Sequence, residues 1–145
     1  MYDVPIPMPS PQSKILIATE SPQIANILTA KLERDGFKVF WKPDGKRTLE
    51  SVLKDPPDLL ILDSILPDDS AFHLLEKFHA LPGLEALPVF ILLDVLQEHS
   101  AEEFLRGGAR AVVQKPFRPT DLSKKIRKTL ASLNLIPNNL VKLST

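Results

Sequence analysis

The sequence predicts an α/β domain whose five parallel strands form a doubly wound sheet. Two short runs, 59–62 and 89–93, are almost wholly apolar and are bounded by turn residues. Apolar runs of this length are typical of strands that are buried on both faces, as in a parallel sheet covered by helices. Stretches of helical period alternate with the runs, which is the order of repeated βα units. The 145 residues fit one domain.

The strands and helices are expected in strict alternation. The aromatic and β-branched run at 37–41 predicts a strand near an edge of the sheet. We expect strands at 14–18, 37–41, 59–63, 88–93 and 111–114. We expect helices at 22–35, 48–53, 71–80, 101–106 and 119–133.

Capping residues predict where several helices begin. Ser21 before Pro22 is an N-cap followed by proline at the first helical position. Ser70 can cap the third helix, and Ser100 with Glu103 forms a capping box. The Pro-Asp-Gly turn at 43–45 places the start of the second helix at residue 48.

Composition excludes several classes of protein. Eighteen acidic and eighteen basic residues balance, so no overall field favours nucleic acid or a membrane surface. The chain has no cysteine, which excludes disulfides and thiolate metal sites. No apolar stretch is long enough to span a bilayer, and the N-terminus does not have the pattern of a secretory signal. We therefore expect a cytoplasmic protein.

Both ends of the chain differ from the domain between them. Residues 1–13 carry alternating prolines and predict a flexible, extended arm. Residues 14–133 contain all the predicted elements, and residues 134–145 form a tail or a linker. A basic stretch at 124–128 is interpreted as the solvent face of the last helix rather than as a nucleic-acid site.

Polar side chains follow three of the predicted strands. Glu20 comes after the first strand, Asp63 ends the third and Lys115 follows the fifth. With right-handed crossovers and the flavodoxin-like strand order 2-1-3-4-5, these three positions converge on one crevice, where such sheets bind ligands. For Asp63 alone, capping of the next turn is the alternative to a functional site.

Taken in order, these features resemble the receiver domains of two-component response regulators. The resemblance covers about residues 14–132. It rests on the first strand with its acidic end and on Gly36-Phe37, the 57–63 run with Pro67 four residues on, Pro88-Val89, Gly107-Gly108-Ala109 and Lys115-Pro116-Phe117. Small flavodoxin-like enzymes fit less well, because no strand is followed by a glycine-rich phosphate loop or a nucleophile elbow.

The resemblance implies a phosphoryl-acceptor site. It identifies Asp63 as the acceptor from a histidine kinase or phosphotransfer protein and Lys115 as the partner of the phosphoryl oxygens, with a cis bond to Pro116. It also implies a Mg²⁺ site made by Glu20, Asp63 and the backbone carbonyl of Ile65. At most, such a domain catalyses its own Mg²⁺-dependent phosphorylation from a phosphodonor; it is otherwise not an enzyme.

The sequence departs from the family at several positions. The acidic pair falls on Thr19 and Glu20, so one carboxylate is missing and Mg²⁺ binding should be weakened. The Ser or Thr that senses the phosphoryl group is replaced by Leu93, which cannot donate a hydrogen bond, and Asp94 follows it. The aromatic switch position is Val112. We therefore expect an atypical receiver with lost switch residues.

Two functions follow from this pattern. The first is a receiver in phosphorelay signal transduction that is phosphorylated on Asp63 and signals by protein–protein interaction. The second is a pseudo-receiver that works without phosphorylation, as a constitutive protein-binding or dimerisation module. In both, the predicted docking surface lies on the 101–106 helix, the 111–114 strand and the last helix, and it takes an output protein or domain or a second copy. No nucleic-acid or membrane partner is expected for this domain.

Overall fold

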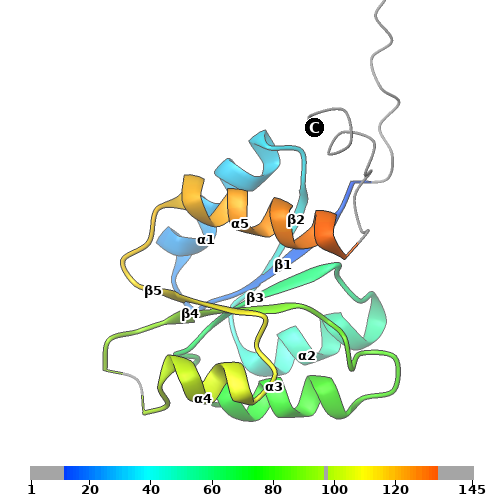
Figure 1. The fold of residues 1–145 in the computed structure, drawn as a ribbon, viewed down its shortest axis with the longest axis vertical. Helices are drawn as coiled ribbons and strands as arrows, with labels where there is room; N and C mark the ends of the chain where they lie inside the picture. Colours follow the sequence, from blue (N-terminus) through cyan, green and yellow to red (C-terminus); the bar gives the residue numbers. More distant parts are fainter. Residues whose placement is uncertain (1–11, 97, 134–145) are drawn as a thin grey trace, which may run out of the picture.

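Five parallel strands form one sheet in the order β2-β1-β3-β4-β5 (Figure 1). This computed structural model describes residues 12–96 and 98–133. The strands are β1 (Lys14–Ala18), β2 (Lys38–Lys42), β3 (Leu59–Asp63), β4 (Val89–Leu93) and β5 (Ala111–Gln114). The register pairs Ile17 of β1 with Ile61 of β3, and Leu62 of β3 with Ile91 of β4. The predicted fold and strand order are confirmed.

Five helices cover the two faces of the sheet (Figure 1). They are α1 (Pro22–Arg34), α2 (Gly45–Lys54), α3 (Ala71–Ala80), α4 (Ala101–Arg106) and α5 (Pro119–Ser132). Helices α1 and α5 lie on one face, and α2, α3 and α4 lie on the other. This is the arrangement that right-handed crossovers produce in a doubly wound sheet.

The apolar strands divide the core into two clusters, one on each face. Every residue of β3 and β4 is buried. Alternate residues of β3 point to opposite sides, so Leu60 and Leu62 belong to the cluster with α3, and Leu59 and Ile61 to the cluster with α5. A strand packed on both faces places its last residue at the carboxyl edge of the sheet with little freedom, and that residue is Asp63.

Helix α2 begins three residues earlier than the sequence predicts. Asp44 is its N-cap and accepts a hydrogen bond from the backbone N of Arg47 at 2.8 Å. The Asp68 carboxylate accepts from the backbone N of Gly45 at 2.7 Å and of Lys46 at 2.9 Å. The prediction of a turn followed by a start at residue 48 was therefore wrong, because a carboxylate from a distant loop completes the cap.

The other capping predictions agree with the structure. Ser21, Ser70 and Ser100 each accept a hydrogen bond from a backbone N three residues on, and the capping box with Glu103 is complete. The residues that follow helices α1 and α4 include Gly36 and Gly108, with φ of 99° and 109°. These left-handed conformations favour glycine.

The ends of the chain are only partly described. The side chain of Gln12 donates to the carbonyl of Gly36 at 3.2 Å, and the carbonyl of Ser13 accepts from the backbone N of Lys38 at 2.9 Å. The rest of the predicted arm, residues 1–11, and the predicted tail, 134–145, lie outside the described residues. Among the described residues, no helix has the length and apolar character needed to cross a membrane.

Candidate functional site

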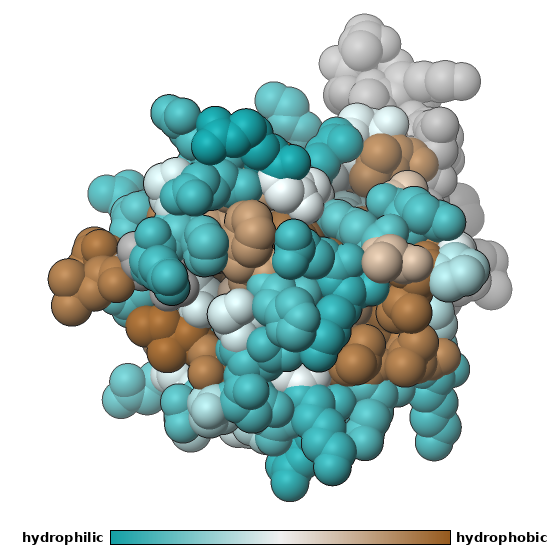
Figure 2. Space-filling view, turned by 90° about the horizontal axis from the view of Figure 1, so that it is seen from below, coloured by the Kyte–Doolittle hydropathy of each residue, from teal (hydrophilic) through white to brown (hydrophobic). Residues whose placement is uncertain are grey.

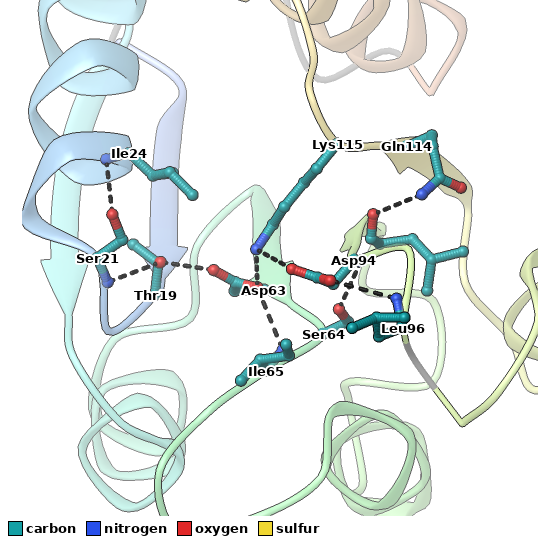
Figure 3. Close-up of polar contacts among 11 residues, drawn as sticks. Thr19, Ser21, Ile24, Asp63, Ser64, Ile65, Asp94, Leu96, Gln114 and Lys115 are labelled. Atoms are coloured by element: carbon teal, nitrogen blue, oxygen red, sulfur yellow. Dashed lines mark hydrogen bonds and ion pairs between the residues drawn. The ribbon is translucent and has the colours of Figure 1, made fainter.

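Asp63 is a nearly buried carboxylate at the end of the central strand (Figure 3). Its relative exposure is 3%. Three donors contact its two oxygens: the Lys115 ammonium, the Thr19 hydroxyl and the backbone N of Ile65. A buried ionised carboxylate requires this kind of compensation.

Lys115 supplies the cation, as the sequence predicts. Its Nζ lies 2.7 Å from Asp63 Oδ1, and the same oxygen accepts from Ile65 N at 3.2 Å. The backbone N of Lys115 donates to the carbonyl of Leu93 at 2.9 Å, which extends the pairing of β5 with β4. The bond between Lys115 and Pro116 is cis. The contact between the Lys115 ammonium and the Asp63 carboxylate is a charge-assisted hydrogen bond, and its length of 2.7 Å is typical of such bonds.

On the β1 side, the residue that contacts Asp63 is Thr19 and not Glu20. Thr19 is fully buried, and its Oγ1 donates to Asp63 Oδ2 at 2.7 Å. Glu20 is exposed at the next position of the chain. The structure therefore brings Asp63 and Lys115 together as expected, and it adds a hydroxyl where the sequence suggested only the loss of a carboxylate.

The donor set fits Mg²⁺ in kind but is reduced in charge. Mg²⁺ takes oxygen ligands and usually keeps several waters. Asp63 and Glu20 offer carboxylates and Ile65 a carbonyl, all near the carboxyl ends of β1 and β3. Among the described residues, no three acidic, histidine or cysteine side chains group together as a metal site. One Asp63 oxygen is already engaged by Thr19, so the hydroxyl competes with a cation for that oxygen.

Leu93 and Asp94 occupy the side of the pocket that β4 forms. Leu93 is 6% exposed and packs in the core on the α3 face, so its side chain is not available to the pocket. Asp94 faces the pocket, and its Oδ2 lies 3.9 Å from Lys115 Nζ (Figure 3). The backbone N of Asp94 donates to Ser64 Oγ at 3.0 Å. Val112 is half-buried against the same cluster as Leu93.

Sequence reasoning missed two contributors to the site, Ser64 and Trp41. Ser64 is 2% exposed and directly follows Asp63. Trp41 lies on the edge strand β2, and its Nε1 donates to the backbone carbonyl of Thr19 at 2.8 Å. Ser64 directly follows Asp63 in the sequence, and that adjacency was a usable signal. The contact of Trp41 depends on the β1–β2 register and could not be read from spacing.

The loop between β3 and α3 is fixed by two carboxylates. Hydrogen bonds from the backbone N of Gly45 and of Lys46 lower the pKa of Asp68. Burial raises the pKa of Asp69, but hydrogen bonds from His73 and Lys77 outweigh it and the net pKa is lowered. Both carboxylates tie the loop after Asp63 to neighbouring helices, which keeps this edge of the pocket in place.

An apolar groove opens beside Asp94 and Lys115. It has a volume of about 450 Å³, and Asp94 and Lys115 lie at its polar end. Its apolar lining comes from α1, the β4–α4 loop and the segment after β5: Ile24, Ile27, Val95, Pro116, Phe117 and Pro119. Val95 and Leu96 are 72% and 89% exposed. Figure 2 shows an apolar protrusion at the edge of the molecule where Figure 1 places the β4–α4 loop.

A known protein family and several curated proteins match this chain over most of its length. Residues 15–127 match the family described as the response regulator receiver domain. The chain is 36% identical over 107 residues to the transcriptional regulatory protein CreB of Escherichia coli, a match that covers 74% of this chain and 46% of CreB. It is 28% identical to an uncharacterized 14.6 kDa protein of Leptolyngbya boryana, a match that covers 81% of this chain and 89% of that protein.

Solved structures agree. A CheY-like response regulator receiver domain protein from Methanospirillum hungatei is 26% identical with a TM-score of 0.77, a match that covers 83% of this chain and 95% of that one. A chemotaxis response regulator of Vibrio cholerae is 25% identical with a TM-score of 0.73, covering 81% and 98%. Apart from the Leptolyngbya protein, the chain spans about half the length of the curated relatives, for example 53% of the DNA-binding response regulator MtrA of Mycolicibacterium smegmatis.

Proposed function

This chain belongs to the response regulator receiver domains, and from that premise we propose that it works in phosphorelay signal transduction with Asp63 as the phosphoryl acceptor. Receiver domains are generally non-enzymatic signalling modules, and they generally bind Mg²⁺ at their acidic site. The observation that carries the proposal is the 2.7 Å contact between Lys115 Nζ and Asp63 Oδ1 at the carboxyl edge of the sheet. A carboxylate that could act as a nucleophile, with a cation beside it, supports this proposal.

The chemistry is a transfer between two side chains. An Asp63 oxygen attacks the phosphorus of a phosphohistidine on the partner kinase or phosphotransfer protein. The P–O bond of an acyl phosphate forms, and the P–N bond breaks as the imidazole leaves. Lys115 lies close enough to Asp63 to stabilise the negative charge on the oxygens of the transferred phosphoryl group. Mg²⁺, when bound, neutralises charge on the phosphoryl group, and Glu20, Asp63 and the Ile65 carbonyl would hold it.

The signal would leave the domain through protein contacts. The surface formed by α4, β5 and α5 is our candidate for docking an output protein or domain, or a second copy in a homodimer. It contains Leu105, which is 47% exposed, and a groove of about 390 Å³ between β5 and α5 whose lining includes Val112, Gln114 and Lys125. Action in the cytoplasm is part of the same proposal.

A second candidate function is favoured by the burial of Asp63. The acceptor is 3% exposed, Thr19 occupies one of its oxygens, and Leu93 and Val112 stand at the switch positions. These features fit a pseudo-receiver that docks partners without phosphorylation. In such a protein Asp63 and Lys115 remain as a structural ion pair.

Intact-mass measurement separates the two candidates. The full chain is incubated with acetyl phosphate and Mg²⁺ beside Asp63→Asn, which keeps the shape of the side chain. We expect slow, Mg²⁺-dependent gain of one phosphoryl group by the wild type and none by the variant. No gain at millimolar Mg²⁺ would overturn phosphoryl acceptance and leave the docking module.

A further inference from the structure

Thr19 is held at four points within the described chain. Its backbone N donates to the carbonyl of Lys42 at 3.1 Å, and its carbonyl accepts from Trp41 Nε1 at 2.8 Å. Its Oγ1 accepts from the backbone N of Ser21 at 3.1 Å and donates to Asp63 Oδ2 at 2.7 Å. The residue is fully buried. Its hydroxyl therefore has little freedom to turn away from Asp63.

The direction of these hydrogen bonds fixes the hydroxyl proton. A hydroxyl has one proton to donate, and a backbone N–H can only donate. Since Ser21 donates to Thr19 Oγ1, the single Thr19 proton is left for Asp63. An ionised carboxylate only accepts, so this arrangement is complementary to charged Asp63.

A divalent cation would compete for the same oxygen. Lys115 and Ile65 both donate to Oδ1, while Oδ2 accepts from Thr19 on the side of β1, the strand that Glu20 follows. A metal held between Asp63 and Glu20 approaches from that side, where the hydroxyl proton already carries partial positive charge. The proton and the Lys115 ammonium together compensate the carboxylate without a metal.

We propose that Thr19 is a positioning residue that sets the divalent-cation affinity of the site, because its hydroxyl holds Asp63 Oδ2 in place of a metal. The inference deepens the proposed function and rests on it for the identity of Asp63 as the reactive group. It differs from the simple loss of a carboxylate at position 19, because it assigns the effect to a hydrogen bond that can be removed without adding charge.

Trp41 provides a reporter of this contact. It is the only tryptophan of the chain, is 39% exposed and bonds directly to the Thr19 carbonyl. The indole N–H bonds to the backbone carbonyl of residue 19, which every variant keeps, so a cation bound beside that residue changes the surroundings of the indole in each of them. Its fluorescence thus follows the site without any phosphodonor.

The test is a Mg²⁺ titration of the full chain followed by Trp41 fluorescence. The matched pair is Thr19→Val, which keeps the shape and removes the hydroxyl, and Thr19→Ser, which keeps the hydroxyl. We expect the Val variant to bind Mg²⁺ about fivefold more tightly than wild type, as the loss of a hydrogen bond of about 1 kcal/mol implies, and the Ser variant to match wild type within about twofold. Adding Asp63→Asn to the Val variant should abolish the response.

Equal affinities of the Val and Ser variants would overturn the inference, as would a response that survives Asp63→Asn. Thr19→Ala serves as a second hydroxyl-free variant, and far-ultraviolet circular dichroism confirms that each variant is folded. Thr19→Asp, which adds charge, gives an upper reference that should exceed the Val variant. Because no phosphodonor is present, failure of phosphoryl acceptance by the wild type leaves this result unaffected, so the two proposals fail separately.

Discussion

The two sides of the Asp63 pocket differ sharply in how firmly they are held. The buried half consists of Thr19, Asp63 and Ser64, with exposures of 0%, 3% and 2%. The exposed half is the start of the β4–α4 loop, where the Asp94 side chain is 31% exposed and Val95 and Leu96 are 72% and 89% exposed. Lys115 joins them, with its Nζ 2.7 Å from Asp63 and 3.9 Å from Asp94. The Asp63 carboxylate is thus fixed by the core, whereas the side chains at the start of the adjoining loop are exposed to solvent.

Because of this difference, substitutions in the buried half should lower the free energy of unfolding, and substitutions in the exposed half should not. The largest effect is expected for Thr19→Val. Removing the hydroxyl takes away one donor to a buried carboxylate, which should lower the free energy of unfolding by about 1 to 2 kcal/mol. Urea denaturation measures it. Thr19→Ser is the control, and a loss in that variant as large as in Thr19→Val would contradict the role of the hydroxyl.

Ser64→Ala should have the next largest effect. Ser64 Oγ accepts from the backbone N of Asp94 at 3.0 Å and connects the two halves. Its removal leaves that N–H without its acceptor, and we expect a loss of about 1 kcal/mol in the free energy of unfolding. Hydrogen exchange should show faster exchange at Asp94. Unchanged exchange there would mean that the bond does not hold the loop.

Acid should destabilise the protein by protonating Asp68 and Asp69, the carboxylates that hold the loop after Asp63. The pKa of Asp68 and of Asp69 is lowered in the folded protein. Each therefore stabilises the fold above its unfolded pKa of about 3.9, and that contribution is lost as the pH falls through the lower folded value. The urea midpoint should fall below about pH 4, and it should fall less steeply in Asp68→Asn. An equal slope in the variant would show that the Asp68 contacts do not support this loop.

Asp94→Asn should affect reactivity more than stability. Asp94 and Lys115 are both partly exposed and 3.9 Å apart, so the free energy of unfolding should change by less than about 0.5 kcal/mol. Removing a negative charge that faces the pocket should raise the rate of modification by acetyl phosphate about two- to fivefold. Asp121→Asn, an exposed acid in the first turn of α5, is the charge-matched control. Equal rates in the two variants would show that Asp94 does not repel the phosphoryl group.

Leu96→Ser should have the smallest effect. The side chain is 89% exposed, and its replacement should change the free energy of unfolding by less than about 0.5 kcal/mol. Thermal unfolding checks this. A loss above about 1 kcal/mol would show that the loop packs on the domain and would remove the contrast between the two halves.

The fold could be predicted because its central strands have a recognisable sequence pattern. Strands buried on both faces are continuous apolar runs, and serine caps mark the starts of several helices. The start of α2 was missed because Asp68 completes its cap from 23 residues along the chain. No local pattern encodes that contact.

The candidate site was predictable only in part. Asp63 and Lys115 follow from the rule that strand ends of a doubly wound sheet converge. The hydrogen bonds from Thr19 to Asp63 and from Trp41 to the Thr19 carbonyl were not predictable. They depend on side-chain directions, which are determined by the packing of β1 between β2 and β3. The sequence showed a missing carboxylate, and the structure shows what took its place.

We propose above all that Asp63 accepts a phosphoryl group while the structural response stays local to the pocket. Amide chemical shifts recorded with beryllofluoride and Mg²⁺ test it most directly, with Asp63→Asn as the control. We expect shift changes at Ile65, Asp94 and their neighbours in the wild type, none in the variant, and little change along β5 and α5. Absence of any change in the wild type would contradict acceptance at Asp63. Large changes through β5 and α5 would contradict the loss of the switch at Leu93 and Val112.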